Sequence, residues 1–173
     1  VQLNSVAMVS ATDGWAVGEN GTLLRWDGQD WSLAVAQRAD RSLVDVAMVS
    51  SVDGWTFSAD GAAFHWDGRA WQEISAAPSP VRTVSMVSAT DGWTLGDGTI
   101  GHWDGRTWTQ AAVPYGRAVD MVSATDGWTV GTNGVMFHWD GHIWSGTDTS
   151  PAAPSLWAVQ MMSATNGWAV GDG

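Results

Sequence analysis

Short apolar runs alternate with glycine- and aspartate-containing turns along the whole chain. In the first unit these runs cover residues 5–10, 14–18 and 21–26, and a fourth run begins at Trp31. Short runs bounded by Asp-Gly, Asn-Gly and Gly-Asp pairs are typical of β-strands joined by tight turns. An amphipathic helix would instead place apolar residues every three or four positions. The pattern therefore predicts four strands in this unit.

The same unit returns along the chain, with four complete copies and half of a fifth. The first copy begins VAMVSATDGWAVG, and the tryptophan of this phrase marks every copy, at Trp15, Trp55, Trp93, Trp128 and Trp168. Spacings of 40, 38, 35 and 40 residues indicate stacked supersecondary units. Four antiparallel strands at this period predict a β-propeller. The competing fold, an open β-solenoid, usually has rungs shorter than about 30 residues.

We therefore predict an all-β chain that forms a single propeller domain, or a propeller segment, over residues 1–173. Its repeats cover about 1–40, 41–79, 80–114, 115–154 and, as a partial blade, 155–173. A half-blade is expected to present an open strand edge, which recruits another strand. Two sources for that strand stay open, namely further blades of a longer parent chain or self-association with a second copy. A compact four-bladed ring with residues 159–173 packed outside it is the remaining alternative.

The turn between the second and third strands sets their register. Glu19-Asn20 fits a two-residue type I′ turn, whereas the third unit is one residue shorter at 96–98 and needs a different turn. Because opposed residues share a face, this register predicts one face with Trp15, Val17, Leu24, Trp26 and Trp31, and a second with Ala16 and Leu23. A face of large residues would then meet a face of small residues between blades. Thirteen of the 14 tryptophans would be packing residues, with Trp157 outside the template.

Eight aspartates recur at two positions of the repeat. Four precede the Gly-Trp pair and four lie in Trp-Asp-Gly: Asp13, Asp53, Asp91 and Asp126, then Asp27, Asp67, Asp104 and Asp140. A carboxylate at such a position accepts hydrogen bonds from nearby backbone N–H groups and fixes a turn. Equivalent carboxylates in every blade also argue against one catalytic acid/base pair.

Composition narrows the chemistry further. The chain has 18 acidic and 7 basic residues, a net charge of -11, and neither lysine nor cysteine. This charge argues against nucleic acid and against an anionic membrane surface as partners. The missing lysine and cysteine exclude P-loop phosphate binding, Schiff bases, thiol nucleophiles, thiolate metal sites and disulfides. No apolar run approaches the roughly 20 residues of a membrane span, so we expect no membrane insertion. We also expect neither a cofactor nor a metal, because equivalent histidines of successive blades lie too far apart to share an ion unless they face the channel.

Two motifs carry a resemblance to known propeller repeats. The Trp-Asp-Gly-x-x-Trp hairpin resembles the Asp-box of BNR-repeat propellers, although its Asp-to-Trp spacing is one residue shorter. The Asp-Gly-Trp-Ala-Val-Gly-x-x-Gly-Thr run resembles the photosystem II assembly-factor type of bacterial propeller repeat, over nearly the whole chain. The resemblance implies a propeller fold. Together with the missing thiols, it implies an extracellular or cell-surface location in a bacterium.

Two sets of residues are candidates for binding. The first lies on the segments between repeats, which form one rim of a propeller and vary in sequence; its members are Arg41, Arg82, Tyr115, Arg117 and Trp157. The second recurs once per blade around Trp-Asp-Gly and combines an aromatic face with polar groups. Its members are Arg25, Trp26, Asp27, His65, Trp66, Asp67, His102, Trp103, Asp104, His138, Trp139 and Asp140.

These two sets support different functions. The variable rim favours a non-enzymatic binding or scaffold propeller that presents its loops to a protein or assembly partner. The repeated set favours a lectin-like module with one weak carbohydrate site per blade, which would gain avidity from multivalency. A sialidase-like hydrolase would draw on Arg41, Arg82, Arg117 and Tyr115, but Glu19 and Glu73 are the only glutamates. We therefore predict a protein that is not an enzyme, with a protein or a glycan as its partner.

Overall fold

The structure, a computed structural model, describes residues 1–34, 41–74, 76–78, 80–113, 115–147 and 153–172. Four sheets of four antiparallel strands follow one another along the chain, and a two-stranded sheet follows them. Blade 1 contains β1 (Leu3–Ser10), β2 (Asp13–Gly18), β3 (Leu23–Trp26) and β4 (Trp31–Leu33), and blade 2 contains β5 (Leu43–Ser50), β6 (Asp53–Ser58), β7 (Ala63–Trp66) and β8 (Trp71–Glu73). The predicted four-stranded unit is confirmed.

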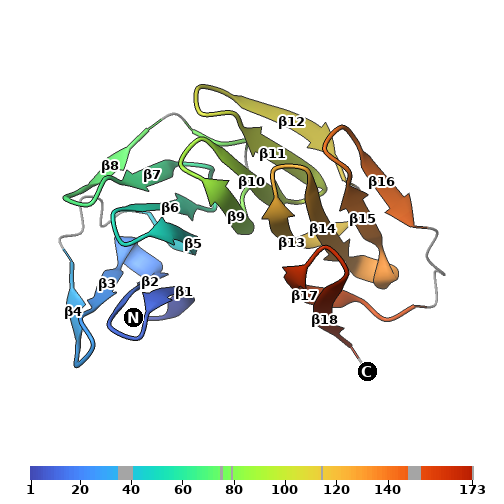
Figure 1. Cartoon of the computed structure of the whole chain (residues 1–173). Coiled ribbons are helices and arrows are strands. Elements are labelled where there is room, and N and C mark those ends of the chain that lie inside the picture. The colour runs from blue at the N-terminus through green and yellow to red at the C-terminus, as the bar shows by residue number, and fades with distance from the viewer. Residues whose placement is uncertain (35–40, 75, 79, 114, 148–152, 173) are drawn as a thin grey trace.

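The later blades repeat this order. Blade 3 contains β9 (Thr83–Ser88), β10 (Asp91–Gly96), β11 (Thr99–Trp103) and β12 (Trp108–Ala112), and blade 4 contains β13 (Gly116–Ser123), β14 (Asp126–Gly131), β15 (Met136–Trp139) and β16 (Trp144–Thr147). The half-blade consists of β17 (Leu156–Ser163) and β18 (Asn166–Gly171). Figure 1 shows the blades along an open arc, with the first strand of each on the inside and the two chain ends flanking the opening. The fold is therefore an open β-propeller.

The turn between the second and third strands differs from the prediction. In blade 1 it is a three-residue 3-10 turn, η1 (Glu19–Gly21), in which Asn20 and Gly21 have φ of 55° and 66°. Blade 4 repeats it as η2 (Thr132–Gly134). The two-residue turn with two positive φ angles occurs in blade 3 instead, at Asp97 and Gly98. Because the turn of blade 1 contains one residue more than predicted, the register between β2 and β3 shifts by one residue from the predicted pairing.

This shift overturns the predicted faces. Trp15 lies opposite Arg25, and Ala16 lies opposite Leu24. The forward face of blade 1, which meets blade 2, therefore carries Trp15, Val17, Leu23 and Arg25. The rear face carries Ala16, Leu24 and the directly opposed pair Trp26 and Trp31. Each blade thus has tryptophan on both faces, and the expected meeting of a large-residue face with a small-residue face is wrong.

Two of the three interfaces between complete blades instead join one forward tryptophan to the rear tryptophan pair of the next blade. Between blades 2 and 3, Trp55 contacts Trp103, and Phe57 contacts Trp108. The ring centroid of Trp15 lies 4.8 Å from that of Trp66 and 5.2 Å from that of Trp71. Between blades 3 and 4, Trp93 lies 4.8 Å from Trp139 and 5.4 Å from Trp144. We call each such group a tryptophan triad. Tilted and edge-to-face rings at these distances add stabilisation beyond the area they bury, so the packing role predicted for these residues has a definite geometry.

Two carboxylates tie neighbouring blades together on the inner strands. Asp45 on β5 accepts hydrogen bonds from Ser5 Oγ of blade 1 at 2.6 Å and from the Val84 N–H of blade 3 at 2.8 Å. Asp120 on β13 accepts a bond from the Met161 N–H of the half-blade at 2.6 Å and lies 3.5 Å from Ser85 Oγ. Burial raises the pKa of both carboxyls. Each of them therefore connects three successive blades at the inside of the arc.

Within the described ranges, no helix is long and apolar enough to cross a membrane.

Candidate functional site

The Trp-Asp-Gly aspartates are part of the hairpin between the third and fourth strands. Asp104 Oδ1 accepts the backbone N–H groups of Arg106 and Thr107 at 2.8 and 2.7 Å, and the equivalent aspartates of blades 1, 2 and 4 make the same two bonds. The glycine that follows has a φ of 88° in blade 3, a conformation that favours glycine. These bonds lower the pKa of each of the four carboxyls. The predicted turn role of this set is confirmed.

This geometry predicts a loss of stability in acid. The folded chain holds these carboxyls at a pKa below the ordinary value of 3.8. The unfolded chain therefore binds more protons, and the free energy of unfolding falls as the pH drops through and below that value. Urea denaturation between about pH 5 and pH 3 measures the slope. Asp104→Asn is expected to reduce the pH dependence of the free energy of unfolding. Asp30→Asn, in the hairpin between β3 and β4 of blade 1, is the control. Equal slopes for wild type and Asp104→Asn would contradict the prediction.

The other aspartates of the repeat bond to side chains rather than to the expected backbone groups. Asp91 Oδ1 lies 2.8 Å from Nε2 of His102, whose ring stacks on Trp93 with a centroid distance of 4.1 Å. Blades 2 and 4 repeat the pair with separations of 2.8 and 2.7 Å, and in blade 1 Arg25 Nε lies 3.3 Å from Asp13 Oδ1. Each pair thus lies on the forward face of its own blade.

The lectin-like set is consequently divided between different surfaces. Within one blade the histidine or arginine lies on the forward face, the tryptophan lies on the rear face, and the aspartate lies in the hairpin. Moreover, the indole N–H of that tryptophan donates to a backbone carbonyl of the turn between the first two strands of its own blade, as from Trp139 to Ala124 at 3.0 Å. The residues that do lie together come from two blades, as where the Arg25 guanidinium lies 5.7 Å from the ring centroid of Trp66 in the next blade.

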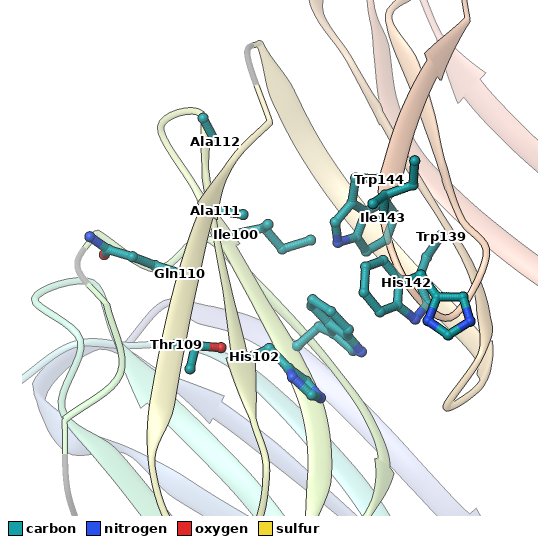
Figure 2. Close-up of a pocket in the computed structure, with 11 residues that line it drawn as sticks. Ile100, His102, Thr109, Gln110, Ala111, Ala112, Trp139, His142, Ile143 and Trp144 are labelled. Carbon is teal, nitrogen blue, oxygen red and sulfur yellow. The ribbon is translucent and has the colours of Figure 1, made fainter.

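Blades 3 and 4 enclose a cavity of about 330 Å³ where such residues meet, and we call it the outer cavity. Its lining comes from both blades: Trp93, Ile100, His102, Thr109, Gln110, Ala111, Ala112, Trp139, His142, Ile143 and Trp144. Figure 2 shows His102 and Thr109 on one side of it and Trp139, His142 and Trp144 on the other, with Gln110 directed away. Of the predicted lectin-like set, only His102 and Trp139 line this cavity.

The predicted rim residues lie closer together than the residues of the lectin-like set. A groove of about 470 Å³, which we call the rim groove, is lined by Arg82, Asp97, Gly98, Tyr115, Gly116, Arg117 and Thr132. Arg82 donates from Nε and Nη2 to Asp97 Oδ1 at 2.7 and 2.5 Å. Arg117 donates from Nε to Thr132 Oγ1 at 2.8 Å. Three of the five predicted rim residues therefore share one groove.

Local backbone irregularities orient these side chains. Arg117 and Trp157 are the extra residues of β-bulges at equivalent positions of blade 4 and the half-blade, and bulges re-aim side chains near binding sites. The Arg117 guanidinium lies 4.3 Å from the Trp157 ring centroid, which is a cation–π contact. Trp157 in turn donates to Asp172 at 2.8 Å. Trp157 of the half-blade therefore packs on one of the two arginines that line the rim groove.

Tyr115 and Arg41 complete the predicted rim set. Tyr115 has a φ of 65°, uncommon for a large side chain, and the residue is 67% exposed. Arg41 lies apart from the groove, where its Nη1 donates to Asp60 at 2.9 Å. Asp97 and Thr132 were not predicted as site residues. The shortened turn of the third unit was the only sequence signal for Asp97, and Thr132 had none.

Among the described residues, no group of three or more His, Asp and Glu side chains could hold a metal ion.

The fold and the repeated interfaces define this chain as a β-propeller. No protein-family model and no curated protein matches it. A solved structure described as YCF48 bound to D1 peptide is similar to it with a TM-score of 0.75 and 18% sequence identity. The match covers 99% of this chain and 62% of that chain, so this chain spans less than two thirds of the similar protein. The similarity confirms the propeller fold that the repeat predicted.

Proposed function

We propose that this chain is a non-enzymatic binding propeller that holds a segment of a protein partner in its rim groove. The observation that carries the proposal is the convergence of Arg82, Arg117 and Tyr115 on one groove, with Trp157 stacked on Arg117. Rigid blades that present variable connecting loops are a common basis for recognition. A propeller of similar fold has been solved with a bound peptide, which supports a protein partner in preference to a small molecule.

The chemistry of the groove favours a segment that carries a carboxylate next to an apolar or aromatic residue. A guanidinium has five N–H donors, and the Arg117–Thr132 bond uses only one of them. Asp97 pairs with Arg82, so the two arginines and one aspartate of the groove leave a local positive charge on a chain whose net charge is -11. Exposed Tyr115 offers an aromatic surface beside them.

A display library of short unstructured peptides, panned against the folded chain, tests this function. We expect enrichment of peptides with acidic residues, and loss of their capture by the Arg82→Ala/Arg117→Ala double variant. Arg69→Ala/Arg106→Ala removes the same charge from two hairpins outside the groove and should capture the peptides normally. No enrichment, or enriched peptides captured equally by both double variants, would contradict the proposal.

A lectin-like role is the second candidate, and the outer cavity is the observation that favours it. Its volume suits a monosaccharide-sized ligand, and its lining combines the rings of Trp139 and Trp144 with the polar side chains of His102 and His142. A glycan array followed by quenching of tryptophan fluorescence tests this role. Binding that is lost in His142→Ala would favour it, and a featureless array would count against it.

A further inference from the structure

Strand β12 is the outer edge of blade 3, and it lies along the outside of the arc (Figure 1). It has five residues, whereas the outer strands β4, β8 and β16 have three, three and four. Proteins usually protect a sheet edge with a short strand, a charged side chain, a proline or a β-bulge. The sequence of β12, Trp-Thr-Gln-Ala-Ala, contains neither charge nor proline, and its pairing with β11 is regular. This edge is therefore suited to accept a further strand.

The ladder between β11 and β12 shows which backbone groups face outward. The Val113 N–H donates to the Gly98 carbonyl at 2.8 Å, just beyond the end of β12. Because bonded and non-bonded pairs alternate along an antiparallel ladder, the N–H and C=O groups of Gln110 and Ala112 point away from β11. Both residues are exposed. The edge of β12 therefore presents main-chain donors and acceptors to the outside.

This edge also connects the two candidate sites at the interface of blades 3 and 4. Thr109 and Ala111 of β12 line the outer cavity, and so do the residues directly opposite them on β11. The next bonded pair along the ladder joins Val113 to Gly98, and Gly98 lines the rim groove. A strand laid along β12 would therefore pass from the outer cavity to the rim groove.

The tryptophans of the outer cavity favour an aromatic occupant. Trp144 lines this cavity, and its equivalent at the interface of blades 2 and 3 is Trp108. Trp108 has an edge-to-face partner in Phe57 of the preceding blade, at a centroid distance of 5.8 Å. In blade 3 the position of Phe57 is taken by Leu95, which has no ring to offer Trp144. An aromatic side chain from outside the chain would supply this contact.

We propose that one extended segment of the protein partner adds to β12 as an antiparallel strand, with an aromatic side chain in the outer cavity and an acidic side chain in the rim groove. The proposal rests on the proposed function, because it keeps the rim groove as the site of the acidic residue. Main-chain bonds to the edge supply affinity, and the two sites supply specificity. An antiparallel strand runs from the groove to the cavity, so the acidic residue precedes the aromatic one, by about four residues on the same face.

The peptide acetyl-GDTVTFTVG-amide, whose aspartate and phenylalanine are four residues apart on one face, tests the proposal on the 173-residue chain. We expect saturable binding by isothermal titration calorimetry and slower backbone hydrogen exchange along β12. Replacing the peptide phenylalanine by alanine should weaken binding at least about tenfold, because the packing in the outer cavity is lost.

Gln110→Pro in the chain tests the strand pairing itself. It removes an outward N–H and places a proline ring against the added strand, so binding should weaken about tenfold. Proline is tolerated at an edge position whose N–H faces solvent, and this variant is therefore expected to fold. Leu33→Pro, at the equivalent outward position of β4 in blade 1, is the matched control and should bind normally.

Four results would overturn the proposal. They are the absence of saturable binding, normal binding by Gln110→Pro, a dimer in light scattering that the peptide does not dissociate, and glycan binding that is lost in His142→Ala. The third result would assign the edge to a second copy of this chain, and the fourth would assign the outer cavity to a sugar. Normal binding by Gln110→Pro together with lost binding by Arg82→Ala/Arg117→Ala would refute strand addition alone and leave the proposed function intact. The reverse pair of results would refute the rim groove as the binding site, and with it both proposals.

Discussion

Replacing Trp93 by alanine is expected to lower the free energy of unfolding by about 3–5 kcal/mol, the cost of truncating a buried aromatic side chain in a core. Trp93 is 3% exposed and packs against His102 of its own blade and against Trp139 and Trp144 of the next. The substitution therefore empties the centre of one tryptophan triad and weakens the contact between blades 3 and 4.

Urea denaturation of the purified variant measures this loss. Trp31→Ala is the control, because Trp31 is 41% exposed on the rear face of blade 1 and belongs to no complete triad. Its expected cost is below about 1 kcal/mol. A loss of less than about 1 kcal/mol for Trp93→Ala would show that the triads do not hold the blades together.

Replacing Asp45 by alanine is expected to cost about 2–3 kcal/mol, because several donors from three blades lose their acceptor at once. The carboxylate accepts Ser5 Oγ–H, the N–H of Val46 and the N–H of Val84. Asp30→Ala, which changes an exposed hairpin side chain, should stay within about 0.5 kcal/mol of wild type. Equal stability of the two variants in urea denaturation would contradict a bridging role for Asp45.

Asp45 also has a predicted pH signature. Because burial raises the pKa of its carboxyl, the folded chain binds this proton more tightly than the unfolded chain. The contribution of Asp45 to stability therefore declines as the pH rises from 3.8 through the folded pKa, opposite in sign to the hairpin aspartates. Asp45→Asn should remove this decline from the difference between stabilities measured at about pH 4 and about pH 6. An unchanged difference would contradict the assignment.

The repeat alone predicted the fold, because a fixed period of strands and turns admits few architectures. The faces were mispredicted, because a single extra turn residue at Gly21 moves every side chain of the third strand to the opposite face. Sequence reasoning could not choose between two- and three-residue turns, since Asn20 tolerates positive φ in either. The error concerned one turn, yet it changed the identity of the inter-blade contact.

The candidate sites show the same limit. The rim residues Arg82, Tyr115 and Arg117 were recognisable as exceptions to the repeat, and the structure places them in one groove. The sequence could not predict that His102 and Trp139 line the same cavity, because this depends on the forward face of one blade meeting the rear face of the next. Within-blade patterns therefore indicate packing units, whereas the candidate sites lie between blades.

An equilibrium titration of one peptide from the display selection tests whether the rim groove binds the partner segment. Arg117→Ala should weaken its binding at least about tenfold, which corresponds to about 1.4 kcal/mol. Arg106→Ala, which makes the same charge change outside the groove, should bind like wild type, as should His142→Ala in the outer cavity. Unchanged affinity for Arg117→Ala together with lost affinity for His142→Ala would place the partner in the outer cavity and contradict binding in the rim groove.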